Sequence, residues 1–162
     1  MTNDPFRPAF EDLPEEIPIF PLPGALLLPG GRLPLNIFEP RYLAMTFDAL
    51  AEARMIGMVQ PLTPEPDPVS TQAALYEIGC AGRIVSFAET GDGRLLITLG
   101  GVGRFRLADE LAEAKGYRRA RADWTAFRDD LEGYAQPVID RAALLDRLRV
   151  FLEAKGIGAD WR

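Results

Sequence analysis

Prolines and glycines interrupt an apolar stretch near the N-terminus, and this pattern limits what the chain can fold into. Residues 20–42 read FPLPGALLLPGGRLPLNIFEPRY. The longest unbroken apolar run in this stretch, Ala25–Leu28, is far shorter than the ~20 residues that a membrane-spanning helix needs. Proline lacks a backbone donor and glycine permits positive φ, so both are typical of strand starts, sheet edges and tight turns. The stretch therefore predicts short strands separated by turns.

Three strands are expected in and just before this stretch. They are Ile17–Phe20, Ala25–Leu28 and Leu33–Phe38. In the third strand, apolar residues alternate with Pro34 and Asn36, as they do where one face of a strand is buried. Short strands divided by proline and glycine favour a small, strongly curved barrel.

A helix is expected to follow, because Glu39 and Pro40 are typical of a helix start. Proline suits the first helical position, where its missing N–H has no partner in any case, and a nearby carboxylate favours the helix dipole. Apolar residues then recur at helical spacing through about Arg54. These residues are Leu43, Phe47 and Leu50.

The residues Glu39, Pro40 and Arg41 are predicted to form a structural hinge between strand and helix. Glu39 and Arg41 lie two positions apart, a spacing at which helical side chains do not face each other. We therefore expect each to anchor a neighbouring segment rather than to pair with the other. Contact of these side chains with a ligand is the alternative.

Most of the remaining chain is predicted to be β-structure. Met55–Leu62 is expected to be a strand, and the proline-rich Pro61–Pro68 a surface loop. Alternation of apolar and polar residues continues from Leu75 to Trp124. The tripeptide Gly91-Asp92-Gly93 between two apolar runs predicts a tight hairpin. Three further glycines, Gly100, Gly101 and Gly103, precede a strand rather than a helix, so they predict a turn or bulge and not a phosphate-binding loop.

The C-terminal segment from Pro137 predicts an amphipathic helix with Gly156 as its C-terminal cap. Its apolar residues are Ile139, Ala142, Leu144, Leu145, Leu148, Phe151 and Leu152. This face is wider than one contact with a barrel would cover, which predicts either self-association or the first part of a helical subdomain. We expect a tail at 1–16, a barrel domain at 17–130 and this helical segment at 131–162.

Composition argues against several kinds of chemistry. The chain has no histidine, which removes the usual general base and the usual zinc ligand. Its serines, Ser70 and Ser86, show no pairing with Lys115 or Lys155, and no phosphate-binding loop motif occurs. The single cysteine, Cys80, is expected to be an ordinary buried residue in a strand. We therefore predict no catalytic, cofactor-binding or metal-ligating residue.

With these elements in place, the chain resembles the N-terminal substrate-recognition domain of the ATP-dependent Lon protease family. The resemblance rests on residues 17–45 (IPIFPLPGALLLPGGRLPLNIFEPRYLAM), 56–60 (IGMVQ), 76–87 (YEIGCAGRIVSF) and 96–107 (LITLGGVGRFRL). It implies a PUA-like β pseudo-barrel in a mainly β, α+β fold, with one inserted helix and the start of a C-terminal helical subdomain. It also implies a noncatalytic module, since none of the family's ATPase or Ser-Lys protease motifs is present, similar to the stand-alone Lon-like proteins of bacteria.

The predicted function is binding of unfolded or tagged protein segments, in company with a separate protease or chaperone. Apolar grooves and exposed strand edges bind many sequences without requiring one side chain. The candidate contact residues are Phe20, Leu28, Phe38 and Tyr42; the alternative is that they belong to the core. The lone cysteine and the absence of a signal-peptide pattern in residues 1–16 favour the cytoplasm.

RNA binding is the alternative function. The one basic cluster, Tyr117-Arg118-Arg119-Ala120-Arg121, would place Arg119 and Arg121 on the same strand face as Tyr117, where they could stack on and neutralise nucleic acid. PUA-like barrels of other families bind RNA, which supports this reading only by analogy of fold. The net charge of −6 and several nearby acids argue for a salt-bridged surface instead.

Overall fold

The computed structural model describes residues 8–63, 69–131 and 140–157. The chain divides into two compact units, Met1–Glu132 and Gly133–Arg162. The strands in the described residues are β1 (Glu16–Pro21), β2 (Arg32–Ile37), β3 (Met55–Val59), β4 (Ile78–Glu89), β5 (Leu95–Ala114) and β6 (Tyr117–Asp123). The helices are α1 (Pro40–Ala51) and α2 (Arg141–Ala154), with short 3-10 helices η1 (Phe10–Asp12) and η2 (Thr125–Asp130).

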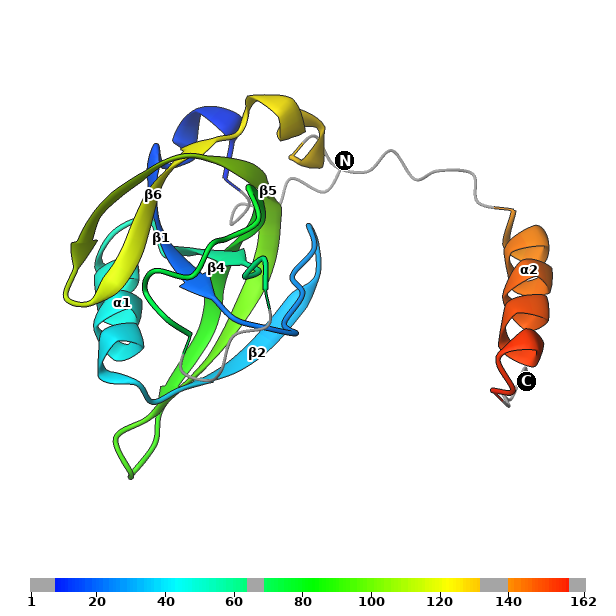
Figure 1. Cartoon of the computed structure of the whole chain (residues 1–162), viewed down its shortest axis with the longest axis horizontal. Helices are drawn as coiled ribbons and strands as arrows, with labels where there is room; N and C mark the ends of the chain where they lie inside the picture. The colour runs from blue at the N-terminus through cyan, green and yellow to red at the C-terminus, as the bar shows by residue number, and fades with distance from the viewer. Residues whose placement is uncertain (1–7, 64–68, 132–139, 158–162) are drawn as a thin grey trace. The chain divides into compact units, whose positions relative to one another are not determined.

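The strands of the first unit curve into a ring (Figure 1). Their order in the sheet is β2-β5-β4-β3-β1-β6, and β5 also pairs with β6. This last pairing closes the ring through β5, β4, β3, β1 and β6, while β2 pairs with the N-terminal half of β5. The pairs are antiparallel except β1 with β3. The mainly β fold with a partly closed ring, which the sequence predicted, is confirmed.

The long strand β5 can pair with three neighbours because a bulge bends it. Ala81 pairs with Gly103 and Gly82 with Gly101, so Val102 is an extra residue on β5. The predicted turn or bulge at these glycines is thus a bulge. A Cβ atom at Gly101 would lie 2.0 Å from the carbonyl oxygen of Leu28. Glycine is therefore required where the loop before β2 crosses β5.

The expected strand at Ala25–Leu28 is wrong, because these residues form an irregular loop. Leu27 is buried, whereas Leu26 and Leu28 are exposed. The loop uses its backbone groups elsewhere: the Gly24 N–H donates to the Gln60 side chain, and the Gly30 N–H donates to the Gly101 carbonyl. These contacts, made with residues distant in sequence, replace the strand pairing that the apolar run suggested.

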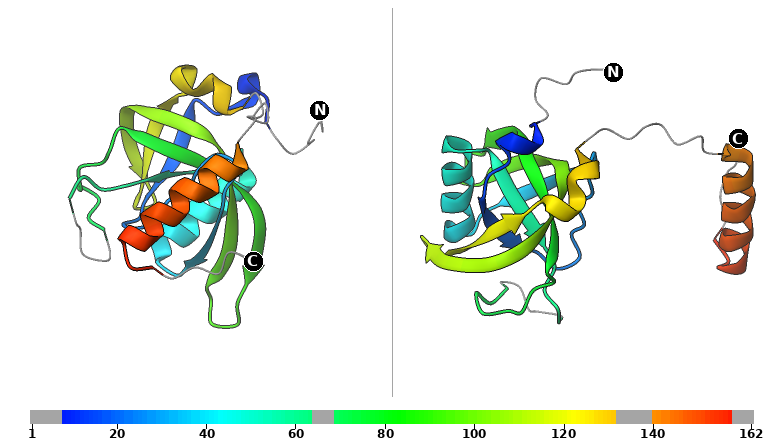
Figure 2. Two further views of the ribbon diagram at one scale, coloured as in Figure 1. Left: turned by 90° about the vertical axis from the view of Figure 1, so that its right-hand side faces the viewer. Right: turned by 90° about the horizontal axis from the view of Figure 1, so that it is seen from above.

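Helix α1 begins at Pro40, as predicted, with Glu39 as its N-cap residue. It lies along one side of the ring and packs against β1, β3 and β6 (Figure 2). Of the predicted apolar stripe, Leu43 and Leu50 are partly buried and pack against the core cluster, whereas Phe47 is 51% exposed. The buried residues are Tyr42, Met45, Thr46 and Ala49.

The buried face of α1 begins at Tyr42. The Tyr42 ring packs on Phe20 at a centroid distance of 4.1 Å, which turns the face beginning at Tyr42 toward the core. Thr46 can be buried on this face because its Oγ1 donates to the Tyr42 carbonyl at 2.8 Å.

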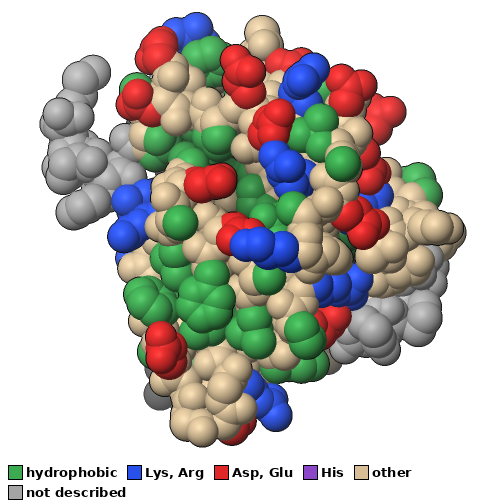
Figure 3. Space-filling view, turned by 90° about the vertical axis from the view of Figure 1, so that its left-hand side faces the viewer, with side chains coloured by type: hydrophobic (Ala, Val, Ile, Leu, Met, Phe, Trp, Pro, Cys, Tyr) green, Lys and Arg blue, Asp and Glu red, His purple; other side chains and the backbone are tan. Residues whose placement is uncertain are grey.

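On the side of the molecule formed by α1 and the β5–β6 hairpin, acidic and basic side chains are interspersed, and hydrophobic side chains form a patch in the lower half (Figure 3).

The second unit contains α2, which is capped at both ends, at its C-terminal end as predicted. The Asp140 side chain accepts from the Ala143 N–H at 3.0 Å. Gly156 has φ 66°, and the Ile157 N–H donates to the Leu152 carbonyl at 2.9 Å, which completes the predicted glycine cap. Pro137 and Ile139, where the sequence predicted the helix to start, lie outside the described residues. No helix in the described parts of the chain is long and apolar enough to cross a membrane.

Candidate functional site

An apolar cleft opens between the end of β1, the edge of β2 and the start of α1. It encloses about 180 Å³, on the order of one large side chain. Its lining comes from four separate parts of the chain, namely Phe20, Pro21, Leu22, Pro34, Leu35, Asn36, Ile37, Phe38, Glu39, Tyr42 and Val69. We call it the β2-edge cleft.

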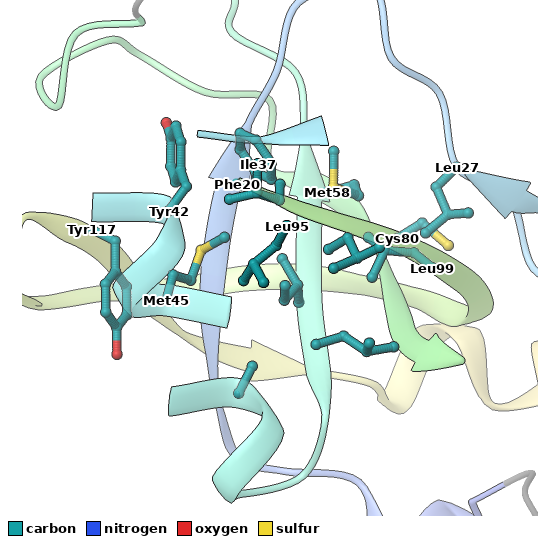
Figure 4. Packing of buried hydrophobic residues seen from close by; sticks show 14 residues of the cluster. Phe20, Leu27, Ile37, Tyr42, Met45, Met58, Cys80, Leu95, Leu99 and Tyr117 are labelled. Atoms are coloured by element: carbon teal, nitrogen blue, oxygen red, sulfur yellow. The ribbon is translucent and has the colours of Figure 1, made fainter. Parts of the chain in front are cut away.

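The β2-edge cleft brings together three of the four predicted contact residues, Phe20, Phe38 and Tyr42, but not Leu28. Phe20 and Tyr42 are 6% and 5% exposed and belong to the core cluster that forms the floor of the cleft. Figure 4 shows Phe20 beside Ile37, with the Tyr42 ring to one side. Phe38 is 53% exposed at the rim, so it is the predicted residue of the cleft that a ligand can reach most readily.

Glu39 and Arg41 pair with each other, contrary to expectation. Arg41 Nη2 lies 2.9 Å from Glu39 Oε2, and Arg41 Nε donates to the same oxygen at 3.0 Å. The spacing argument fails because Glu39 is the N-cap and has extended rather than helical backbone angles, so its side chain can turn toward Arg41. Arg41 Nη2 also donates to the Val69 carbonyl at 3.0 Å, and its guanidinium lies 4.5 Å from the Tyr42 ring centroid.

The side chain of Gln60, which sequence reasoning missed, holds the turn that contains Leu22, one of the lining residues of the cleft. Its Nε2 donates to the carbonyl oxygens of Leu22, at 2.9 Å, and of Ala25, while its Oε1 accepts from the Gly24 N–H at 3.2 Å. These bonds hold the turn after β1 in place. No local signal in the sequence could identify Gln60, because its partners lie more than 30 positions away.

The three arginines of the basic cluster on β6 each have a carboxylate partner. Arg118 is buried; it contacts Glu110 through Nε at 3.1 Å and donates to the Ala73 carbonyl at 2.7 Å. Arg119 pairs with Glu16. Arg121 lies 3.9 Å from Asp109. These pairs place negative charge beside each cation of the proposed RNA-binding face.

The aromatic member of that cluster, Tyr117, is 6% exposed and forms part of the core. Its hydroxyl donates to Asp48 Oδ2 at 2.9 Å, and Lys115 contacts the other oxygen of the same carboxylate at 2.6 Å. Burial, reinforced by Asp48, raises the pKa of Tyr117 to about 12. Hydrogen bonds from Lys115 and Tyr117 lower the pKa of Asp48.

Cys80 is buried, as expected, and burial raises the pKa of its thiol to about 12. A thiol with so high a pKa is protonated at neutral pH and is a poor nucleophile. Within residues 8–63, 69–131 and 140–157, no group of three or more Asp, Glu or Cys side chains is arranged to hold a metal ion.

An apolar cleft beside a strand edge is the kind of surface that binding domains offer to extended peptides. The chain belongs to the family of the substrate-binding domain of ATP-dependent protease La (Lon), which it matches over residues 16–152. Members of this family supply the substrate-binding part of the protease rather than its catalytic part.

Individual relatives agree with this assignment. The chain is 36% identical to Lon protease 2 of Myxococcus xanthus over 114 residues, and this alignment covers 70% of this chain and 13% of that protein. It is also 31% identical to the protein cereblon of Danio rerio over 68% of this chain and 26% of that protein. The chain therefore spans only a small part of the length of these curated relatives.

Solved structures show the same fold. A Lon N-terminal domain protein from Xanthomonas campestris superposes with a TM-score of 0.54 at 30% identity, covering 67% of this chain and 58% of that one. The N-terminal domain of a Mycobacterium avium complex Lon protease gives a TM-score of 0.55 at 14% identity, over 87% of this chain and 69% of that one. At 14% identity the second likeness supports the fold alone.

Proposed function

We propose that this chain is a noncatalytic module that binds unfolded or tagged polypeptide segments through the β2-edge cleft. The observation that carries the proposal is the position of Phe38, an aromatic ring 53% exposed at the rim of an apolar cleft in a substrate-binding domain. Unfolded proteins expose the large apolar side chains that such a cleft accepts. The rim of the cleft needs no particular partner sequence, because burial of apolar surface is non-directional.

Membership of this family also suggests which proteins the module works with. We infer that the module acts in the cytoplasm and presents bound segments to a separate protease or chaperone. In this account residues 17–130 form the recognition domain, and residues 131–162 form the first part of a helical subdomain. RNA binding through Arg119 and Arg121 is the competing function that the experiment below separates from it.

The proposal is tested by titrating the protein into a fluorescently labelled, permanently unfolded polypeptide and, in parallel, a labelled single-stranded RNA at physiological salt. We expect saturable anisotropy changes for the polypeptide and none for the RNA. Binding to RNA alone, weakening steeply as salt rises, would replace polypeptide binding with the alternative function.

Two phenylalanines provide a matched pair of variants for the same titration. Phe38 lies in the cleft and is 53% exposed, whereas Phe47 lies on α1 outside the cleft lining and is 51% exposed. Phe38→Ser is expected to weaken polypeptide binding about tenfold, equivalent to about 1.4 kcal/mol. Phe47→Ser should leave binding within about twofold of wild type. Equal losses in both variants would show that the cleft is not the site.

A further inference from the structure

The β2-edge cleft follows the edge of a strand rather than its face. Six consecutive residues, from Pro34 to Glu39, line it, and the first four belong to β2. Because successive side chains of a strand point to opposite faces, a pocket on one face would contact every second residue. A lining that includes every residue instead runs beside the backbone, where N–H and C=O groups project sideways.

This edge is unpaired in the described part of the chain, since β2 pairs there with β5 alone. In an antiparallel pair, residues alternate between those whose backbone groups point to the partner and those whose groups point away. The Gly101 N–H donates to the Gly31 carbonyl at 2.9 Å. When the register is followed from this bond, the backbone N–H and C=O groups of Leu33, Leu35 and Ile37 point toward β5. Pro34 and Asn36 therefore present their backbone groups to the cleft.

A second bond confirms this direction from the other side of β5. The Thr90 N–H donates to the Arg94 carbonyl at 3.0 Å, so the backbone groups of Arg94 point toward β4. The backbone groups of the next residue, Leu95, therefore point toward β2, where its register partner is Ile37. Proline at position 34 agrees, because a residue without an N–H is tolerated on the outward side of an edge strand.

The edge is rich in acceptors and poor in donors. Its central part offers the carbonyl oxygens of Pro34 and Asn36 but the N–H of Asn36 alone. On the opposite wall, pairing of β1 with β6 ends at Ile19, and Pro21 beyond it also lacks an N–H. Edges with so few donors resist pairing with copies of themselves. They remain able to accept hydrogen bonds from the N–H groups of another chain.

We propose that the bound polypeptide lies as an extended strand along the free edge of β2. It donates two backbone N–H groups, from residues i and i+2, to the carbonyls of Pro34 and Asn36, and one of its own carbonyls accepts from the Asn36 N–H. It also places one apolar side chain in the cleft. Carbonyls two residues apart in a strand are about 6.8 Å apart, the spacing of alternate N–H groups in an extended ligand. This inference rests on the proposed function and specifies its ligand as a non-proline, extended segment with one apolar anchor, recognised mainly through its backbone.

The test uses a synthetic peptide with one central leucine flanked by polar residues, and a set in which each backbone amide in turn is N-methylated. We expect two amides two positions apart to be sensitive, each methylation lowering affinity fivefold or more, while methylation elsewhere has less than a twofold effect. No sensitive position, or equal sensitivity at every position, would overturn the inference.

Two variants at one residue test the protein side. Asn36→Ala removes the side chain but keeps the outward N–H, whereas Asn36→Pro removes that N–H. The proline variant is expected to bind at least fivefold more weakly than the alanine variant, with circular dichroism confirming that both fold. Equal binding of the two folded variants would contradict the strand model even where the unmodified peptide binds, leaving the proposed function intact. Failure of the unmodified peptide to bind at all would overturn the proposed function and this inference together.

Discussion

At the scale of single residues, Gly101 is, among the glycines that the structure describes, the one least able to accept a side chain. An added Cβ would lie 2.0 Å from the Leu28 carbonyl oxygen and 3.3 Å from the Pro29 Cα, both of which are backbone atoms that cannot rotate away. Gly101→Ala should therefore displace the loop before β2. We expect a loss of more than about 2 kcal/mol in the free energy of unfolding, measured by urea denaturation.

The matched control is Gly91→Ala at the tip of the β4–β5 hairpin. An added Cβ there meets nothing within 4 Å, and its φ lies outside the left-handed region. We expect its free energy of unfolding to lie within about 0.5 kcal/mol of the wild-type value. Similar stability of both alanine variants would show that the loop does not cross β5 at Gly101.

Asp130 makes stability depend on pH. It is buried, accepts from the Arg104 N–H at 2.9 Å, and pairs with the Arg104 guanidinium at 2.8 Å. The side-chain hydrogen bond from Arg104 lowers the pKa of Asp130 below its usual value. The stabilisation is therefore present above the unfolded-state pKa of about 3.9 and is lost as pH falls through the lower folded-state pKa.

Asp130→Asn should consequently lower the free energy of unfolding by about 1–2 kcal/mol at pH 7, a moderate value because the Arg104 side chain is half exposed. The difference from wild type should shrink as pH falls below about 4. Urea denaturation at several pH values measures this trend. A difference that stays constant down to pH 2 would show that the carboxylate charge is not responsible.

Much of the residue-level prediction from sequence depended on backbone chemistry. Pro40 and Gly156 could be placed at a helix start and a helix end because proline and glycine have strong positional preferences. The Glu39–Arg41 pair and the role of Gln60 could not be predicted. The pair depends on the extended backbone of the N-cap Glu39, and the role of Gln60 depends on partners more than 30 positions away, neither of which helical spacing records.

At the scale of elements, Arg41 connects the start of α1 with the segment after residue 68. It donates to Glu39 and to the carbonyl of buried Val69. Arg41→Ala removes these charge-assisted bonds and should lower stability by about 1–2 kcal/mol. For a chain of this length that corresponds to a fall in the melting temperature of roughly 3–6 °C in differential scanning calorimetry.

Arg106→Ala serves as the comparison, because Arg106 and Glu77 form an exposed pair whose side chains do not line the cleft. Exposed pairs contribute little, so the melting temperature should change by less than about 2 °C. If Arg41→Ala melts like wild type while polypeptide binding falls, Arg41 contacts the ligand and has no structural role.

Elements whose signal is local in the sequence were predicted well, and features set by distant contacts were not. Alternation at Leu33–Ile37 and the Gly91–Gly93 turn predicted β2 and the β4–β5 hairpin, since pairing and turn geometry both leave local signals. The apolar run Ala25–Leu28 and the place of Phe47 in the stripe on α1 were misleading. In each case the structure shows a contact with a residue distant in sequence, Gln60 for the loop and Phe20 for the helix, that local patterns do not record.

At the scale of the whole molecule, α2 carries apolar side chains that its own unit does not bury. Leu144, Leu145, Leu148 and Phe151 lie on one side of the helix and are each at least 40% exposed. A 14-residue helix is marginal in water unless its apolar side packs on something. We expect concentration-dependent self-association, measured by sedimentation velocity between about 1 and 100 μM.

Leu148→Lys should abolish this association, while Val150→Lys, on the opposite side of the helix, should not. A wild-type protein that stays monomeric over the whole concentration range would instead leave the helical subdomain as the expected partner of α2.

The cleft could not be predicted as a unit from the sequence, since its lining comes from four segments that only the closed ring brings together.

The most direct test of polypeptide recognition at the β2-edge cleft is a ¹⁵N NMR titration of the protein with an unfolded polypeptide. The account predicts chemical-shift changes concentrated at Leu35, Asn36, Phe38 and Val69, with little change along β6. Changes confined to Arg118–Arg121, or the absence of any change at saturating polypeptide, would contradict it.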